Sequence, residues 1–200
     1  MAGRRRHLGP VALLLLAAIS SGCDSTIVNT NDARPTTAPS TTTAPPFANP
    51  TNNDLLANAF DYAAPGPDGA TAYYFTTPSK RWVCAIVPRT NAGCQAATGS
   101  TLPVKGAPDT VPGPDGTDTA PNAIQVGRTG DPSFAALESP GFSPVPGPPV
   151  VLPFGKVLIA SGFRCNVQEA TGISCASEFT GNGFTFSADG FTTQYTDLPA

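Results

Sequence analysis

Residues 82–94 have the sequence Trp-Val-Cys-Ala-Ile-Val-Pro-Arg-Thr-Asn-Ala-Gly-Cys, and a similar unit follows at residues 163–175. In both units an aromatic residue stands two places before a cysteine, and nine residues separate the two cysteines. Aromatic and β-branched residues favour strands. The repeated spacing therefore predicts two copies of one β-hairpin.

Four cysteines can pair in three ways. We favour Cys84–Cys94 and Cys165–Cys175, in which each disulfide joins the two strands of its own hairpin. Closing each loop restricts the unfolded chain by roughly 3 kcal/mol in the chain-entropy model. The alternative is a four-cysteine metal site. Zinc ligands usually come in pairs two to four residues apart, and exported compartments oxidise thiols, so we expect disulfides and no metal.

The sequence around these units predicts a mainly β domain over residues 52–200, built as a small antiparallel sheet or a barrel-like sheet with long Pro- and Gly-rich loops. Gly and Pro together make up 43 of the 200 residues, which is typical of a turn-rich β protein. Further strands are expected at residues 72–76, 124–126, 156–160, 184–187 and 191–195. Residues 102–122 are expected to form a long loop, not a domain boundary.

The sequence Pro-Gly-Pro-Asp-Gly occurs twice, at residues 65–69 and 112–116. Its aspartates, Asp68 and Asp115, are the type of side chain that binds calcium, but such a site needs several converging oxygen ligands. Asp-Gly is also a common turn sequence, so we interpret both segments as turns.

Residues 1–22 have the features of a secretory signal peptide. Arg4, Arg5 and Arg6 precede an apolar stretch of about a dozen residues, which is shorter than the roughly 20 residues of a membrane span. Ser21-Gly22-Cys23 resembles the bacterial lipobox, which implies that Cys23 is lipidated and becomes the new N-terminus. The alternative, cleavage after Ser20, leaves Cys23 as a free thiol in an oxidising compartment. The odd number of cysteines favours the lipid.

After Cys23, the segment at residues 23–51 is rich in Thr and Pro and has almost no large apolar residues to bury. It is therefore predicted to be a disordered spacer. The lipid on Cys23 and the spacer predict that the protein is held at the outer face of the cytoplasmic membrane. If Cys23 carries no lipid, the protein is expected to be secreted.

Charge and composition exclude several function classes. Removing residues 1–22 leaves eight Lys and Arg against 14 Asp and Glu, a net charge of −6, which argues against nucleic acid as a partner. The single histidine, His7, lies in the signal peptide, so no histidine-based triad is available. A carboxylate pair or a Ser-Lys dyad stays open as an alternative, but no spacing singles one out. We predict no enzyme and no cofactor.

The order of motifs resembles that of a known family. Residues 75–84 are Phe-Thr-Thr-Pro-Ser-Lys-Arg-Trp-Val-Cys, and later come Phe163-Arg164-Cys165, Gly172-Ile173-Ser174-Cys175 and Gly181-Asn182-Gly183-Phe184. This is similar to a group of small actinobacterial exported proteins and lipoproteins that carry S-P-S-G-N-x-x-C, then G-x-x-C, then G-H-G-F. Here Lys80 and Arg81 replace the Gly-Asn, and Asn182 replaces the His. The likeness covers about residues 72–195 and implies a fold and a location, but no activity.

The expected function is therefore a non-catalytic binding or interaction module of the cell envelope. Its partners are membrane lipid through Cys23 and either a cell-wall glycan or an envelope protein. Tyr73, Tyr74 and Trp82 are the candidate binding residues, because clustered aromatics can form a platform for a glycan or a lipid, although aromatics in strands are more often part of a core. The alternatives are a glycan- or small-molecule-binding lipoprotein and, less favoured, a carboxylate-dependent hydrolase.

Overall fold

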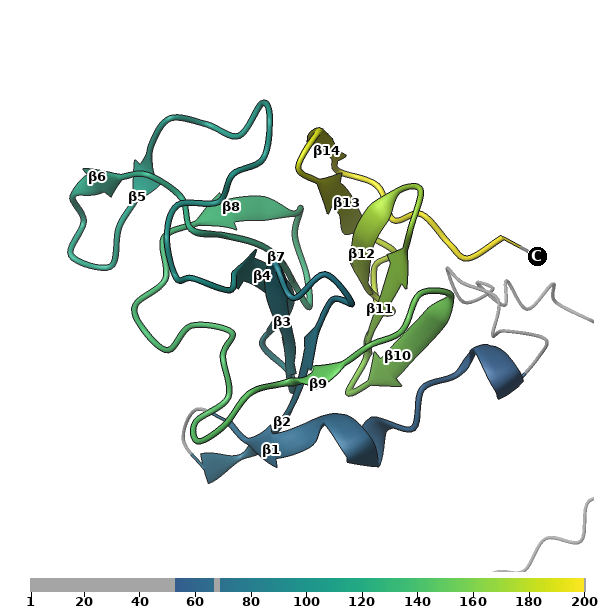
Figure 1. Ribbon diagram of the computed structural model, residues 1–200. Coiled ribbons are helices and arrows are strands. Elements are labelled where there is room, and N and C mark those ends of the chain that lie inside the picture. Colours follow the sequence, from purple (N-terminus) through teal and green to yellow (C-terminus); the bar gives the residue numbers. More distant parts are fainter. Residues whose placement is uncertain (1–52, 67–68, 200) are drawn as a thin grey trace, which may run out of the picture. The chain divides into compact units, whose positions relative to one another are not determined.

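The computed structural model describes residues 53–66 and 69–199 (Figure 1). The predicted signal peptide, Cys23 and the Thr/Pro-rich segment lie outside the described residues. Within the described part there is no α-helix. Two short 3-10 helices, η1 (Asn53–Leu55) and η2 (Ala59–Tyr62), precede the strands. No helix in this part is long and apolar enough to cross a membrane.

The first sheet has seven strands in the order β1-β2-β3-β4-β7-β8, with β9 also pairing with β2. All neighbours are antiparallel except β2 and β9, which are parallel. Its strands are β1 (Ala63–Pro65), β2 (Thr71–Thr76), β3 (Trp82–Val87), β4 (Asn91–Ala96), β7 (Ala123–Gly127), β8 (Ser133–Ala135) and β9 (Val150–Val151).

The second sheet is an antiparallel meander of five strands, in chain order. These are β10 (Lys156–Ala160), β11 (Phe163–Gln168), β12 (Gly172–Ser177), β13 (Gly183–Ser187) and β14 (Gly190–Thr192). The predicted long loop between β4 and β7 contains a small separate hairpin of β5 (Val111–Pro112) and β6 (Asp118–Thr119). The predicted mainly β, antiparallel fold is therefore confirmed.

Both predicted disulfides are present. Cys84 lies directly opposite Cys94 in the β3–β4 pair, and Cys165 lies directly opposite Cys175 in the β11–β12 pair. All four cysteines are fully buried. Each disulfide therefore joins the two strands of one hairpin, as the repeated spacing predicts.

The duplication extends beyond the hairpins. The five strands β2-β3-β4-β7-β8 form a meander like β10–β14, and in both the disulfide joins the second strand to the third. The β3–β4 pairing is repeated residue for residue in β11–β12: Trp82 opposite Ala96 corresponds to Phe163 opposite Ser177. The first copy differs in the long loop between its third and fourth strands and in a longer turn between its first and second.

The segment that precedes each meander pairs with the first strand of the other meander. Leu56, which precedes the first meander, pairs in parallel with Val157 in β10, and the Ala57 N–H donates to the Val157 carbonyl at 2.8 Å. Val151, which precedes the second meander, pairs in parallel with Thr76 in β2. Strands β2 and β10 are the first strands of their meanders. Each sheet is thus extended, beside its first meander strand, by the segment that leads into the other.

The main core lies between the inner faces of the two sheets. Strand β12 packs against β4 and β7, and both disulfides belong to the core cluster. Trp82 meets Phe186 edge to face with ring centroids 5.0 Å apart, and Phe134 meets Phe191 in the same way at 4.7 Å. These contacts join a strand of one sheet to a strand of the other. Burial of aromatic rings supplies much of the stability of such a small domain.

The outer face of each sheet is crossed by the segment that follows its last meander strand. On the second sheet this is the C-terminal segment, drawn in yellow in Figure 1, and Asn166 donates from its Nδ2 to the Thr196 carbonyl at 2.9 Å. On the first sheet it is residues 136–147, whose Phe142 N–H donates to Gln95 Oε1 at 2.8 Å. This second crossing forms the candidate site.

Candidate binding cleft

The outer face of the first sheet carries small side chains beside one large one. Successive residues of a strand alternate between the faces, and the register places Tyr74, Ala85 and Gly93 in one outward row. No side chain larger than a hydrogen atom fits at Gly93 without displacing its neighbours. A Cβ there would collide with the Phe142 ring and would lie 2.7 Å from the Ile124 carbonyl oxygen. The glycine therefore allows the ring of the crossing segment to rest on the sheet.

Two polar side chains fix the crossing segment in place. The amide of Asn122 donates to the Leu137 carbonyl and accepts from the Leu137 N–H, both at 2.8 Å. Further along, Gln95 accepts from Phe142 N–H and donates to Ser143 Oγ at 3.1 Å. Phe142 is consequently only 3% exposed. The start and the middle of the segment are thus anchored by side chains of the sheet and its adjoining loop.

A cleft of about 650 Å³ remains between this segment, β2 and the β3–β4 turn. Its volume is in the range typical of small-molecule and cofactor sites. The wall is mainly apolar. It includes Ala72, Tyr74, Val87, Leu137, Phe142 and Val145.

The polar groups of the cleft are few. Burial raises the pKa of Tyr74 above its ordinary value of 10.0. Like any tyrosine at physiological pH, it carries a neutral hydroxyl that can donate a hydrogen bond. Asn91 also lines the cleft, and its Nδ2 donates to Gln125 Oε1 at 2.7 Å. Its Oδ1 is the one buried side-chain nitrogen or oxygen in the described part of the chain that has no hydrogen-bond partner.

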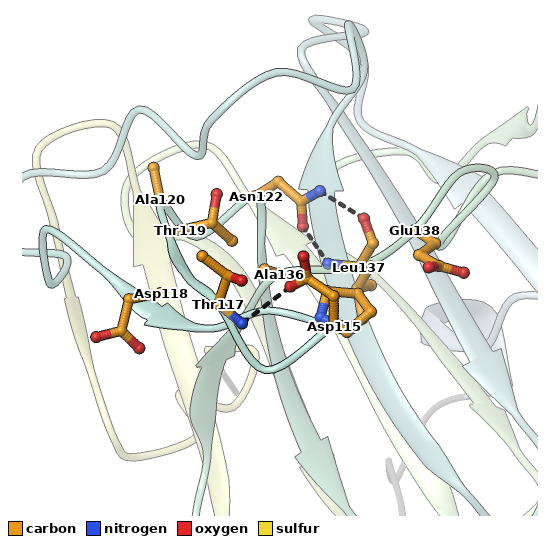
Figure 2. A pocket seen from close by; sticks show the side chains of 10 residues that line it. Asp115, Thr117, Asp118, Thr119, Ala120, Asn122, Ala136, Leu137 and Glu138 are labelled. Atoms are coloured by element: carbon orange, nitrogen blue, oxygen red, sulfur yellow. Dashed lines mark hydrogen bonds between the residues drawn. The ribbon is translucent and has the colours of Figure 1, made fainter.

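A second hollow, of about 470 Å³, adjoins the start of the crossing segment (Figure 2). It carries Asp115, Asp118 and Glu138, and Leu137 and Glu138 line both hollows. Figure 2 shows Asp118 and Glu138 at opposite ends, with their carboxylates pointing in different directions. Asp115 Oδ1 accepts from Thr117 N–H at 2.9 Å, as expected of a turn residue.

The acidic side chains near the two hollows belong to different parts of the fold. Within the described residues, no group of three or more His, Cys, Asp or Glu side chains is placed to hold a metal ion. Glu178 forms a salt bridge with the buried Arg164, in which Arg164 Nη2 lies 2.9 Å from Glu178 Oε1. Glu138 lies at the edge of the cleft, and Glu169 is exposed in the β11–β12 turn. The acidic hollow therefore brings three carboxylates, those of Asp115, Asp118 and Glu138, to one side of the domain.

The candidate aromatic residues do not share a surface. Trp82 is 6% exposed and packs in the core on Phe186, and Tyr73 lies on the same inner side. Tyr74 is on the opposite face, where it lines the cleft. Adjacent residues of one strand point to opposite faces, which separates Tyr73 from Tyr74. The sequence pattern did not single out the segment at residues 136–147, because nothing in its composition shows which sheet it covers.

No family model matches this chain, and no curated protein or solved structure matches it.

Proposed function

We propose that the protein is a non-catalytic binding module of the bacterial cell envelope, anchored to the outer face of the cytoplasmic membrane by a lipid on Cys23. The observation that carries the binding function is the apolar cleft under residues 136–147. The equivalent face of the second sheet is covered by the chain itself. A preformed apolar cavity with a few polar groups is the usual form of a ligand site.

The cleft supports binding rather than catalysis. Among the described lining residues, Glu138 is the only charged one, and none is a histidine, lysine or cysteine. Nucleophilic and general acid–base catalysis usually need two suitable groups close together, such as a nucleophile and a base. The described lining residues offer only Glu138. A glycan would need an accessible aromatic face for stacking, whereas the Tyr74 side chain is buried, at 4% exposure. The cleft therefore favours an apolar or amphipathic ligand over a sugar.

The location rests on the sequence before the domain. The lipobox-like Ser21-Gly22-Cys23 supplies the anchor, and two buried disulfides fit an oxidising compartment outside the cytoplasm. Intact-mass analysis of the protein from its native membrane tests this directly. A lipid mass on an N-terminal Cys23 is expected, and Cys23→Ser should leave the detergent phase. An unmodified N-terminus elsewhere would refute the anchor.

Binding is tested with Nile red, a neutral apolar dye, and the full chain carrying Cys23→Ser, so that no detergent is required. We expect saturable fluorescence enhancement that is at least fivefold weaker in Val145→Glu. Val145 is 62% exposed on the cleft wall, so the change should not affect folding. The matched control is Val150→Glu, at a valine that is 48% exposed in β9 and outside the cleft. Equal loss in both variants, or no saturable binding, would contradict the cleft assignment.

A further inference from the structure

We infer that the two crossover segments of the domain, residues 57–62 and 152–155, rest on the surface of the bilayer, with the rings of Phe60 and Phe154 among the lipid headgroups. The inference rests on the proposed lipid anchor and adds a second, non-covalent contact with the membrane. It is carried by two observations: the apolar side chains exposed on these segments, and the point at which the chain from Cys23 reaches the domain.

The two crossovers cover the same side of the domain. Residues 57–62 lead from the pairing of Leu56 with β10 to strand β1, which pairs with β2. Residues 152–155 lead in the opposite direction, from β9, which pairs with β2, to β10. The hydroxyl of Tyr62, at the end of the first crossover, donates to the Val151 carbonyl, directly before the second, at 3.3 Å. Both crossovers therefore lie along the side where β2 and β10 begin the two meanders (Figure 1).

The crossovers expose large apolar side chains. Phe60 is 86% exposed and Phe154 is 47% exposed, and Leu56, directly before the first crossover, is 37% exposed. They are three of the six exposed large apolar residues in the described part of the chain. A single exposed apolar residue needs no explanation, whereas several on one side of a domain indicate a contact surface. Moving such rings out of water is favourable.

The turn η2 holds Phe60 in its exposed position. The Phe60 N–H donates to Asn58 Oδ1 at 3.3 Å, and the Asp61 N–H donates to the Asn58 carbonyl at 3.1 Å. Tyr62, two residues after Phe60, is buried in the core. The first crossover thus buries one aromatic ring and presents the other to solvent, as part of one hydrogen-bonded turn.

The chain from Cys23 reaches the domain on this same side. The Lys156 side chain donates to the Asp54 carbonyl, which places the first described residues beside β10. Cys23 precedes Asn53 by 30 positions, a span of at most about 100 Å when fully extended. A lipid on Cys23 therefore keeps the crossovers close to the bilayer, where a high effective concentration favours even a weak apolar contact.

The charges of these segments favour an apolar contact over an electrostatic one. Between residues 54 and 62 and between residues 152 and 157, the charged side chains are Asp54, Asp61 and Lys156. They give no basic patch that would attract anionic headgroups. Aromatic rings are favoured at the level of the headgroups. The contact should therefore form on neutral phosphatidylcholine and should not depend on salt.

The test uses the full, lipid-carrying protein in phosphatidylcholine vesicles, with and without bromine on the acyl chains. Bromine quenches a tryptophan that reaches the bilayer. Phe60→Trp supplies the reporter beside the native Trp82, which is 6% exposed in the core. The matched control is Phe179→Trp, at a phenylalanine that is 65% exposed in the β12–β13 turn. Brominated lipid should remove at least a third of the fluorescence that Phe60→Trp adds, and less than a tenth of that added by Phe179→Trp.

A second variant tests whether both crossovers take part. Phe154→Ser in the Phe60→Trp background should at least halve the quenching, whereas Phe179→Ser in the same background should leave it unchanged. Equal quenching in Phe60→Trp and Phe179→Trp, or no effect of Phe154→Ser, would overturn the inference.

The outcomes separate this inference from the proposed anchor. Mass analysis of the same vesicles shows whether Cys23 carries a lipid. If it does and Phe60→Trp is not quenched, the inference is wrong and the anchor stands. If Cys23 carries no lipid, the anchor fails and the inference fails with it. Nile red binding in the cleft is independent of both results.

Discussion

Gly93 is the residue on which the geometry of the cleft depends most. Its missing side chain lets the Phe142 ring lie directly on the sheet, and this contact sets the height of the crossing segment above Tyr74. The sequence shows a glycine next to a cysteine but not the ring that packs on it, because Phe142 belongs to a distant part of the chain. The need for glycine here arises from tertiary packing and not from an unusual backbone angle.

Gly93→Ala should lower the free energy of unfolding by about 1–3 kcal/mol, the usual cost of overpacking a core. Urea denaturation of the purified chain measures this change. In a Phe142→Ala background the same substitution should cost less, because the ring is gone and only the Ile124 carbonyl remains close. An equal cost in both backgrounds would show that Phe142 does not rest on Gly93.

Tyr195 gives the protein a predictable sensitivity to alkaline pH. Burial raises the pKa of Tyr195 to about 12, with the Asn166 hydrogen bond acting in the opposite direction. A raised pKa means that the folded state favours the protonated phenol. The associated stability is therefore fully present below pH 10 and is lost as the pH rises from 10 through about 12. Burial raises the pKa of Tyr62 and Tyr74 as well, which acts in the same direction.

Between pH 9 and pH 11, the contribution of Tyr195 should fall by about 1.3 kcal/mol. Urea denaturation at the two pH values, compared with Tyr195→Phe, measures it. The phenylalanine variant should lose less stability over this interval, because it has no phenol to ionise. If both proteins lose the same amount, Tyr195 is not the residue that titrates.

At the scale of elements, the sequence predicted the strands that contain aromatic and β-branched residues. The expected strands at residues 72–76 and 156–160 match β2 and β10 to within one residue. The composition of Asn91–Ala96 gave no strand signal of its own, because it has neither a β-branched nor an aromatic residue. It forms β4 because β3 and β7 pair with it on both sides and its cysteine joins it to β3.

The expected strand at residues 191–195 is shorter in the structure, where β14 ends at Thr192. Tyr195 leaves the sheet and is buried against Asn166 instead. The aromatic residue that indicated a strand therefore serves to cover the sheet. Strand propensity alone cannot distinguish these two uses of a tyrosine, because both bury the ring.

The two disulfide-linked hairpins should contribute similarly to stability. Each bond joins cysteines ten positions apart. The double change Cys165→Ala with Cys175→Ala should cost roughly 3 kcal/mol, and so should the equivalent change in the first hairpin. The single change Cys165→Ala should free one thiol, which alkylation and peptide mapping would place at Cys175. A free thiol at Cys84 or Cys94 would contradict the pairing.

At the scale of the whole molecule, the duplicated cysteine spacing predicted two related hairpins but not two related sheets. The exchange of leading segments depends on pairings such as Leu56 with Val157, which lie in opposite halves of the domain sequence. Such contacts leave no local pattern in a sequence. The cleft could not be predicted from the sequence for the same reason. It depends on how residues 136–147 cross the first sheet, which differs from the way the C-terminal segment crosses the second.

We propose that the cleft of the first sheet holds a ligand at the cell surface. The most direct measurement places a photo-crosslinking amino acid, p-benzoylphenylalanine, at position 145 in the full-length protein and irradiates intact cells. The same residue at position 150, on an exposed strand outside the cleft, serves as control. We predict a discrete adduct at 145 and none at 150. No adduct at 145, or the same adducts at both positions, would show that the cleft does not hold a ligand in the cell.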